Sequence, residues 1–253
     1  MGGLRAAHFS IGGESVRERI KRTEMLLGAA AMERLRAAHV IVFGLGGVGS
    51  WCAEALARSG VGRLTLVDED SVSESNLNRQ VCALGSTIGR PKAEVMAERL
   101  CDIAPDAEIR SVTARYESAS RSRFFPGDYA YVADCIDLVS CKLDLIDAAL
   151  EGGTPIISAL GTGNKLDASR LEVCDLAETR GCPLARVMRR ELRRRGVEHL
   201  RVVYSPEEAL EPSQPDAPPP GRRSVPGSTV WVPASAGLLM AQAIVLFIAG
   251  VEE

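Results

Sequence analysis

The sequence lacks any C-x-x-C pair, although it contains seven cysteines. Their positions are scattered and their number is odd, which argues against a disulfide scaffold and against a paired-thiolate zinc site. Cys174 and Cys182, in VCDLAETRGCP, also have a poor spacing for zinc. We therefore expect no structural zinc and a reducing compartment, with the cytoplasm as the simplest location.

The sequence also lacks a large excess of one charge, and it lacks a secretory signal. The formal net charge is -3, so the molecule as a whole is not an evident polyanion-binding protein, and any nucleic-acid contact must come from a local basic patch. The segment MGGLRAAHFSIGGESVRERIKR has no apolar core of the kind that a secretory signal needs. His8, His39 and His199 form no constellation that indicates a catalytic or metal site.

Charged residues are absent from residues 225–251, and this leaves two interpretations. One is a membrane span, but proline, glycine, serine and glutamine interrupt the stretch, and its dense apolar part, GLLMAQAIVLFIAGV, is short for a span. The other is a buried core helix, which is the structure we expect. The expected partners therefore include no membrane.

Hydrophobic residues make up 46% of the 253 residues, enough for a sizeable core in one α/β domain. A helical segment at 14–37 precedes the strand AHVIVFG, a glycine loop, the helix VGSWCAEALARSG and the strand RLTLVDED. This order predicts a βαβ unit with a parallel sheet. Further strands are predicted at AEIRSVTA, YAYVADCID, TPIISALG, RLEVCDLA and HLRVVYS, and a final strand and helix in TVWVPASAGLLMAQAIVLFIAG.

The predicted fold class is α/β, with a doubly wound, Rossmann-like, mostly parallel sheet and an appended C-terminal α+β lobe. Three regions are predicted along the chain. Residues 1–18 form a loosely ordered N-terminus, and residues 19–164 form the nucleotide-binding core. Residues 165–253 form the lobe, with a mobile proline-rich loop at 212–227 and a final core helix.

The stretch VIVFGLGGVGSW fits G-x-G-x-x-G through Gly44, Gly46 and Gly49, and Gly47 adds a fourth glycine. Such glycines allow a tight turn, close approach of the backbone to phosphate, and close packing of helix on strand. The next strand ends in Asp68, whose carboxylate can accept hydrogen bonds from ribose hydroxyls. NAD and ATP both contain an adenosine ribose, so these features leave the nucleotide open, and a tight turn without a ligand is a third interpretation.

The stretches DEDSVSESNLNRQ and GRPK separate the two nucleotides. Adenylation builds charge on the α-phosphate as pyrophosphate leaves, and fixed cations lower that barrier, whereas a nicotinamide enzyme needs no such cluster. The sequence has no G-K-[ST] P-loop, so Arg79 and Lys92 would supply these cations. The alternative for each is an exposed charge that pairs with solvent or with a nearby carboxylate.

The run GLGGVGSW…LVDEDSVSESNLNRQ…GRPKAE…DCID resembles the ThiF/MoeB family of ubiquitin-activating-like adenylating enzymes. The resemblance implies ATP and Mg²⁺ as cofactors. It assigns Arg79, Lys92 and Asp137 to catalysis, with Asp137 also as the magnesium ligand. Arg22 would cross a homodimer interface into the opposite site, although a solvated helix arginine is its alternative. The implied nucleotide-binding residues are Gly44, Gly46, Gly47, Gly49, Asp68, Asp70, Asn76 and Gln80.

The second half contains GTGNKLDASRLEVCDLAETRGCPLARVMRRELRRRGV, VVYSPEEA and GSTVWVPASAGLLMAQ, and it resembles the threonylcarbamoyladenosine dehydratase branch of that family. The resemblance implies that the substrate is a tRNA carrying threonylcarbamoyladenosine. ATP would activate the threonyl carboxylate as an acyl-adenylate. Attack by the carbamoyl oxygen would then close an oxazolone ring and release AMP. Because both reacting groups belong to one molecule, no covalent enzyme intermediate is needed.

Arginines crowd the predicted helix PLARVMRRELRRRG, and four of them share one face: Arg186, Arg189, Arg190 and Arg193. They either contact RNA phosphates or form a solvated face that pairs with Glu191 and neighbouring acids. Cys182 precedes this helix, where the helix dipole and the arginines favour a thiolate, so a covalent relay through Cys182 is an alternative to direct ring closure.

Three other functions are alternatives to tRNA modification. Adenylation of the C-terminal carboxylate of a ubiquitin-like sulfur carrier would involve sulfur-transfer protein partners in place of RNA. A nicotinamide dehydrogenase would explain the glycine loop but leave Arg79, Lys92 and Asp137 without a role. A catalytically silent ATP-binding scaffold would need fewer of these residues.

Overall fold

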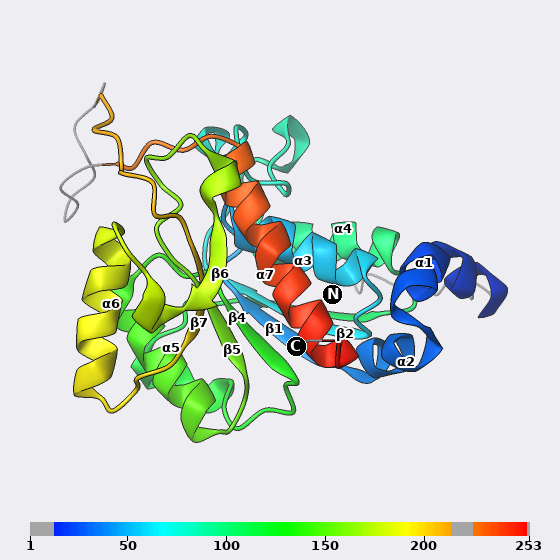
Figure 1. The fold of residues 1–253 in the computed structure, drawn as a ribbon. Coiled ribbons are helices and arrows are strands. Elements are labelled where there is room, and N and C mark those ends of the chain that lie inside the picture. The colour runs from blue at the N-terminus through cyan, green and yellow to red at the C-terminus, as the bar shows by residue number, and fades with distance from the viewer. Residues whose placement is uncertain (1–12, 214–224, 252–253) are drawn as a thin grey trace.

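Seven strands form one sheet within residues 13–213 and 225–251, the part of the chain that the computed structural model describes (Figure 1). The spatial order is β3-β2-β1-β4-β5-β7-β6. Neighbouring strands are parallel except β6 and β7, which are antiparallel. The strands are β1 (His39–Phe43), β2 (Arg63–Asp68), β3 (Glu108–Thr113), β4 (Tyr131–Asp134), β5 (Ile156–Ala159), β6 (Glu172–Asp175) and β7 (Arg201–Tyr204). The predicted doubly wound, mostly parallel sheet is confirmed.

Helices cover both faces of this sheet (Figure 1). The α-helices are α1 (Gly13–Leu27), α2 (Ala29–Ala37), α3 (Gly49–Arg58), α4 (Lys92–Ile103), α5 (Val139–Glu151), α6 (Pro183–Arg194) and α7 (Trp231–Ala249). Short 3-10 turns lie at η1 (Glu74–Asn76), η2 (Gly85–Thr87), η3 (Ser118–Arg123), η4 (Ala168–Arg170) and η5 (Leu176–Glu178). Residues after about 165 supply β6, β7, α6 and α7, so the C-terminal part is built onto the same sheet.

The central strand β1 explains why there are two cores. Val40 and Val42 pack into the cluster that includes residues of α2, α3, α4 and α7. Ile41 and Phe43 pack into the other cluster, with residues of α5 and α6. Because successive strand residues point to opposite faces, the uninterrupted apolar run VIVF is what a parallel strand covered on both faces requires.

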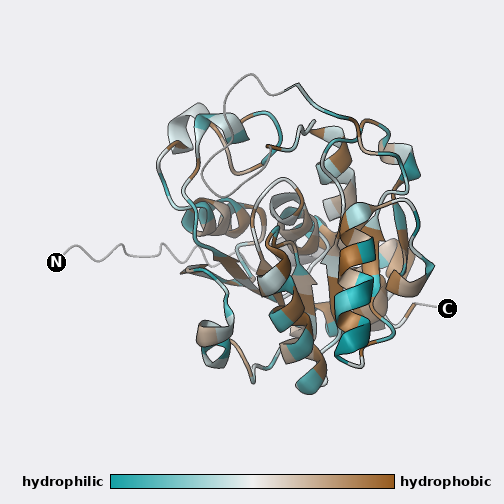
Figure 2. Ribbon diagram, turned by 90° about the vertical axis from the view of Figure 1, so that its left-hand side faces the viewer, coloured by the Kyte–Doolittle hydropathy of each residue, from teal (hydrophilic) through white to brown (hydrophobic). Residues whose placement is uncertain are grey.

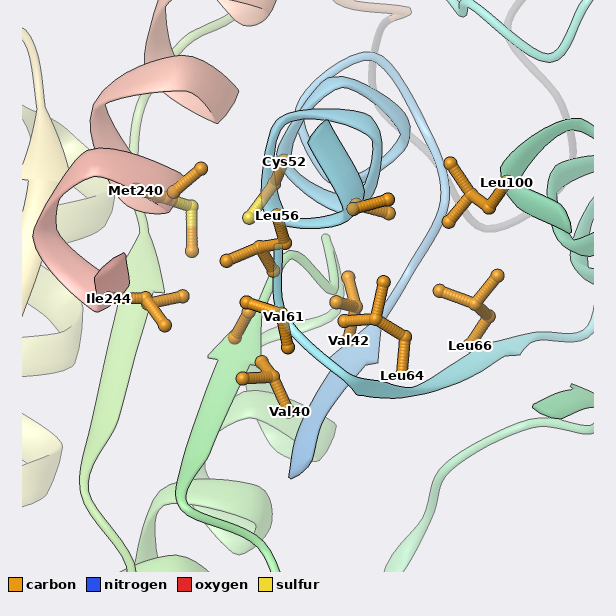
Figure 3. Close-up of a cluster of buried hydrophobic side chains, with 14 of the residues drawn as sticks. Val40, Val42, Cys52, Leu56, Val61, Leu64, Leu66, Leu100, Met240 and Ile244 are labelled. Carbon is orange, nitrogen blue, oxygen red and sulfur yellow. The ribbon is translucent and has the colours of Figure 1, made fainter. Parts of the chain in front are cut away.

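Helix α7 lies in the first of these cores, as the sequence predicts. It is the one helix among the described residues that is long and apolar enough to cross a membrane by length and composition. Its Met240 and Ile244 pack toward Cys52 and Leu56 of α3 (Figure 3). A Cβ on Gly237 would lie 2.3 Å from the Val48 carbonyl oxygen, so only glycine permits this close crossing of α7 over the start of α3. The apolar sequence of α7 is thus accounted for by packing inside the protein.

Several predicted boundaries differ from the structure. The helix predicted at 14–37 is two helices, because Gly28 adopts a φ of 82° between them. Of the N-terminus predicted at 1–18 to be disordered or loosely ordered, residues 13–18 are helical in α1, residues 1–12 lie outside the described residues, and the degree of order stays a prediction. The strand predicted just before the last helix is also wrong, since Trp231 already opens α7. Most of the predicted proline-rich loop, residues 214–224, lies outside the described residues, and the 164/165 boundary stays a prediction.

Candidate active site

The glycine loop between β1 and α3 has the tight geometry that its sequence predicts. A Cβ on Gly49 would lie 1.8 Å from the Gly44 carbonyl oxygen, and one on Gly44, whose φ is +85°, would lie 2.7 Å from the Cys135 carbonyl oxygen. At Gly46 the nearest atom to such a Cβ, Nε2 of Gln80, is 4.0 Å away. Gly44 and Gly49 therefore close the turn, while Gly46 leaves space beside the backbone that a phosphate could approach.

Asp68, at the end of β2, fixes this loop through its carboxylate. Its Oδ2 accepts a hydrogen bond from the Leu45 N–H at 2.6 Å, and its Oδ1 accepts one from the Asp70 N–H at 2.8 Å. Burial raises the pKa of Asp68, and the Leu45 N–H and the Lys92 ammonium group oppose that shift. The carboxylate thus has a structural role in the loop; its binding of ribose stays a prediction.

Lys92 lies at the start of α4, almost completely buried, at 5% exposure. Its Nζ is 2.8 Å from Oδ2 of Asp70, and its N–H donates to the Asp70 carbonyl oxygen at 2.9 Å. Asp70 itself is exposed. The alternative, an exposed charge that pairs with solvent or with a nearby carboxylate, is met in its second half, since Lys92 pairs with Asp70. Lys92 is not exposed, however, and a buried ammonium group held by one exposed carboxylate is a fixed cation beside the loop.

The turn that contains η1 brings three further predicted residues to the loop. The Asn76 side-chain oxygen caps the turn by accepting from the Ser73 N–H at 3.1 Å, so Asn76 has a structural role here. Arg79 donates through Nη1 to the Ser75 carbonyl oxygen, and its Cγ would be 3.4 Å from a Cβ on Gly47. Burial lowers the pKa of the Arg79 guanidinium, yet it remains a cation at neutral pH because arginine titrates far above that range.

Gln80 provides the clearest sign that this site takes a ligand. The side chain is buried, and its Oε1 has no hydrogen-bond partner. A buried acceptor without a partner is costly. The amide lies next to the open space at Gly46. A nucleotide bound over the glycine loop would fit this arrangement, because it offers hydroxyl and amino donors to Gln80 and phosphates to the loop and to Lys92.

Asp137 follows β4 at the same edge of the sheet and is exposed. Sequence reasoning singled out Asp137 but missed Asp134, which is completely buried in the same motif. Asp134 accepts from Lys142 Nζ at 2.9 Å and from Ser158 Oγ at 2.6 Å. Lys142 Nζ also donates to the Ile136 carbonyl oxygen at 3.0 Å, so this buried ion pair holds the backbone beside Asp137. The signal was a lysine among the apolar residues of SCKLDLIDAAL.

The donor set at Asp137 fits Mg²⁺ only in part. The described residues contain no cluster of three or more His, Cys, Asp or Glu side chains that could hold a metal. Magnesium is commonly bound by one or two carboxylates together with waters and substrate phosphates. Asp137 could therefore hold a magnesium ion that arrives with ATP, and the structure offers no dedicated metal cage in the part that it describes.

A segment just before α7 was also missed by sequence reasoning. The Gly227 N–H donates to Oδ1 of Asn164 at 2.5 Å, and Asn78 donates to the Ser228 carbonyl oxygen at 3.0 Å. Trp231 donates through Nε1 to the Leu166 carbonyl oxygen at 2.6 Å. These bonds connect the loop after β5 with the turn that carries Arg79 and Gln80. Because these segments are far apart in the chain, no local sequence pattern could have predicted that they meet.

Three predicted features lie away from the glycine loop. Arg22 is exposed on α1, whose Arg19 donates to the Ala57 carbonyl oxygen near the far end of α3. Helix α6, which carries the four arginines, lies across the molecule from α1 (Figure 1). Cys182 caps α6, with Sγ accepting from the Ala185 N–H at 3.5 Å, and it is buried at 4% exposure. A relay through Cys182 would require its thiol to become exposed.

Together, the Rossmann-like sheet, the glycine loop and the cations of Arg79 and Lys92 define a nucleotide-binding protein of the adenylating type. A family comparison gives the same class. The chain belongs to the ThiF family, whose model matches residues 20–253.

Individual relatives agree with this assignment. The chain is 37% identical over 234 residues to tRNA threonylcarbamoyladenosine dehydratase of Bacillus subtilis, covering 89% of this chain and 92% of the relative. It superposes with a TM-score of 0.85 and 33% identity on the Escherichia coli enzyme TcdA in complex with ATP, over 94% of this chain and 97% of that one. Molybdopterin-synthase adenylyltransferase of Salmonella typhimurium is 40% identical, but over only half of each chain.

Proposed function

We propose that this protein is an ATP-dependent tRNA threonylcarbamoyladenosine dehydratase. The observation that carries the proposal is the open glycine loop beside the unpaired Gln80 oxygen and the buried Lys92, in a chain similar to the dehydratases over nearly its whole length. Adenylation of a ubiquitin-like sulfur carrier is less well supported, because the similarity to the adenylyltransferase of that type covers half of the chain.

The reaction has two steps that consume one ATP. A carboxylate oxygen of the threonyl group attacks the α-phosphorus, the bond to pyrophosphate breaks, and an acyl-adenylate forms. The carbamoyl oxygen then attacks the acyl carbon, AMP leaves, the carbamoyl nitrogen loses a proton, and an oxazolone ring closes. The nucleoside has lost one water, and ATP has become AMP and pyrophosphate. Holding both groups in one substrate makes ring closure effectively unimolecular.

The residues of the loop region take separate parts in this chemistry. Backbone N–H groups at Gly46 and at the start of α3 bind phosphate oxygens. Lys92 and Arg79 stabilise the charge that develops on the α-phosphate and on pyrophosphate, because fixed cations need no reorganisation during the reaction. Gln80 orients the nucleotide through its free oxygen. Asp137 would hold Mg²⁺, which would neutralise phosphate charge as pyrophosphate leaves.

We further propose a homodimer in which Arg22 enters the partner's site. Within one protomer Arg22 cannot serve its own nucleotide, since α1 contacts the far end of α3 while the glycine loop precedes its start. A helix of ten residues spans about 15 Å. The Arg22 side chain has no hydrogen bond or ion pair with any residue that the structure describes, and it is exposed. Both features support the proposal that Arg22 reaches the active site of the partner subunit.

A cytoplasmic location and sulfur-transfer protein partners belong to the same proposal. The seven cysteines, all of them within the described residues, are free thiols, and free thiols persist in reducing compartments. Membership of the ThiF family supports the sulfur-transfer partners.

Nucleoside mass spectrometry tests the function directly. The purified protein is incubated with Mg-ATP and tRNA carrying threonylcarbamoyladenosine, and AMP is measured in the same tube. We expect the nucleoside to lose the mass of one water, with one AMP released per nucleoside converted. Asp137→Ala should fold, because its side chain is exposed, and should convert no nucleoside. An unchanged nucleoside, together with ATP–pyrophosphate exchange that depends on a small protein ending in Gly-Gly, would refute the proposal in favour of sulfur-carrier activation.

A further inference from the structure

Helix α6 presents a concentrated positive surface that the adenylation chemistry does not use. Its buried side, Ala185, Met188 and Leu192, packs into the second core. The side next to it carries the exposed Arg186, Arg190 and Arg193 and the half-buried Arg189, here called the arginine face. These four and Arg194 line an open hollow of about 440 Å³ with no acidic residue among its lining side chains. In Figure 2, α6 is turned toward the viewer and shows a strongly hydrophilic outer side.

Few carboxylates neutralise this surface. Glu191 accepts from Arg190 and Arg194, and Asp147 accepts from Arg195. Arg186 and Arg193 are exposed, and neither side chain has a hydrogen bond or ion pair with any residue in the described ranges. The solvated, acid-paired face that the sequence left open as an alternative is therefore limited to the Glu191 side of the helix.

Arg189 is held in place by neutral groups. Its Nη1 donates to the Thr179 carbonyl oxygen and to Thr179 Oγ1, each at 2.7 Å, and to the Leu176 carbonyl oxygen at 3.3 Å. These acceptors orient the guanidinium without cancelling its charge. A guanidinium fixed in this way is suited to bidentate binding of phosphate.

Helix stability does not explain the arrangement. Arg186 and Arg190, and Arg189 and Arg193, are like charges four residues apart, and such pairs destabilise a helix. Arg186 also lies in the first turn of α6, where the positive end of the helix dipole disfavours a cation. Arg193, in the last turn, is favoured by the dipole, but the dipole does not account for Arg186 or for the like-charged pairs. A surface of like charges with one carboxylate, Glu191, paired to it is best explained by binding to a polyanion.

The position of α6 relates this surface to the active site. The Cys182 sulfur that caps α6 lies against Gly161, since a Cβ there would be 2.3 Å from Sγ. Gly161 follows β5 at the edge of the sheet where the glycine loop and Asp137 also lie. The arginine face therefore begins next to that edge and extends about 10 Å along the helix axis from Arg186 to Arg193.

We propose that the arginine face binds the phosphate backbone of the tRNA substrate, outside the modified nucleotide itself. The inference rests on the proposed function, because that reaction supplies the polyanion. It assigns tRNA affinity to residues that touch neither ATP nor the reacting carboxylate. Binding to phosphates carries no base sequence information, so the face would contribute to affinity and orientation rather than to the choice of nucleotide.

The test compares the wild type with the double variant Arg186→Gln/Arg193→Gln. The measured quantity is the Kd for an unmodified transcript of one tRNA, in the absence of ATP. At low salt, we expect the double variant to bind about tenfold more weakly than the wild type. The slope of log Kd against log salt should decrease by about 1.5, because each lost phosphate contact removes about 0.7–0.9 from that slope. The matched control is Arg36→Gln/Arg110→Gln. Both of these arginines are exposed and lie on α2 and β3, away from α6, so the net charge changes equally.

Two results would overturn the inference. One is wild-type binding and an unchanged salt slope in the Arg186→Gln/Arg193→Gln variant; the other is equal weakening in the control, which would attribute binding to overall charge. ATP affinity should be unchanged in both variants, which confirms that they are folded. Because the transcript carries no threonylcarbamoyl group, this outcome is separate from that of the dehydration assay. Failure of dehydration with intact arginine-dependent binding would refute only the proposed function.

Discussion

At the scale of single residues, glycines with similar sequence signals have different physical tasks. The motif G-x-G-x-x-G gives Gly46 and Gly49 equal weight. In the structure, a Cβ on Gly49 would overlap the Gly44 carbonyl oxygen at 1.8 Å, whereas a Cβ on Gly46 would have no neighbour closer than 4.0 Å. Gly49 is therefore required for the fold of the loop, and Gly46 is required only if a ligand approaches the backbone.

The pair Gly46→Ala and Gly49→Ala separates these two tasks. We expect Gly46→Ala to keep the free energy of unfolding within about 0.5 kcal/mol of the wild type while ATP binds at least tenfold more weakly, because the methyl group occupies the phosphate path. Gly49→Ala should be less stable by about 2–3 kcal/mol, since the loop must shift to avoid overlap. Urea unfolding and calorimetric ATP titration measure both quantities. Wild-type ATP affinity in Gly46→Ala would place the phosphates elsewhere.

At the scale of secondary-structure elements, the buried ion pair between Asp134 and Lys142 joins the end of β4 to the first turns of α5. Both side chains are completely buried. Ser158 of β5 donates to the same carboxylate, and the Ile136 N–H donates to its other oxygen at 3.2 Å. Three elements thus converge on one carboxylate directly before Asp137. The network fixes the backbone from which Asp137 extends.

Removal of one partner should cost more than removal of the pair. We expect Lys142→Met to lower the free energy of unfolding by about 3–5 kcal/mol, because Asp134 is left as a buried, uncompensated charge. Asp134→Asn/Lys142→Met should recover at least half of that loss, since no buried charge remains. Urea unfolding of the wild type, both single variants and the double variant gives the coupling energy. Additive effects of the two substitutions would show that the ion pair has no such role.

The elements also show which features the sequence could predict. The strands β1, β2, β4 and β5 were predictable because each contains a short apolar run, and the glycine loop because its residues are adjacent in the chain. The edge strand β3, EIRSVT, is mostly polar, and its place after a predicted helix was the better guide. The break at Gly28 was not, since one glycine in an amphipathic segment is compatible with a continuous helix. The contact of Asn164 with Gly227 and the pairing of Asp134 with Lys142 depend on how distant elements meet. Of the predicted site residues, those near the loop lie together, and their roles stay predictions.

At the scale of the whole molecule, the placement of α1 decides how Arg22 can act. Arg19, one turn earlier, forms an ion pair with Asp106 at 2.7 Å and a hydrogen bond with the Ala57 carbonyl oxygen at 3.1 Å. Ile20 is buried in the first core. These contacts attach α1 to the edge of the molecule where α3 ends, while Arg22 remains exposed. Arg19 is thus a structural residue, and Arg22 is the residue left exposed for the proposed contact with a partner subunit.

Complementation between inactive variants tests this assignment. Arg22→Ala and Lys92→Ala should each be inactive in the dehydration assay. After unfolding together and refolding, or after coexpression, half of the dimers would combine the two variants, and each mixed dimer would contain one site with an intact Lys92 and an intact Arg22 from the partner. We therefore expect about one quarter of wild-type activity in the mixture, from the pairing statistics of a two-fold dimer.

The matched control is a mixture of Arg22→Ala with Lys92→Ala/Arg22→Ala, in which no site has both residues and no activity should return. If Arg22 acted within its own subunit, each site of a mixed dimer would still lack one residue, so the first mixture would be as inactive as the control. Activity near one quarter in the first mixture alone would require that each active site be built from two chains. Dimer formation would then be part of the catalytic machinery, because a separated subunit would lack a cation at the phosphates even with its own fold intact.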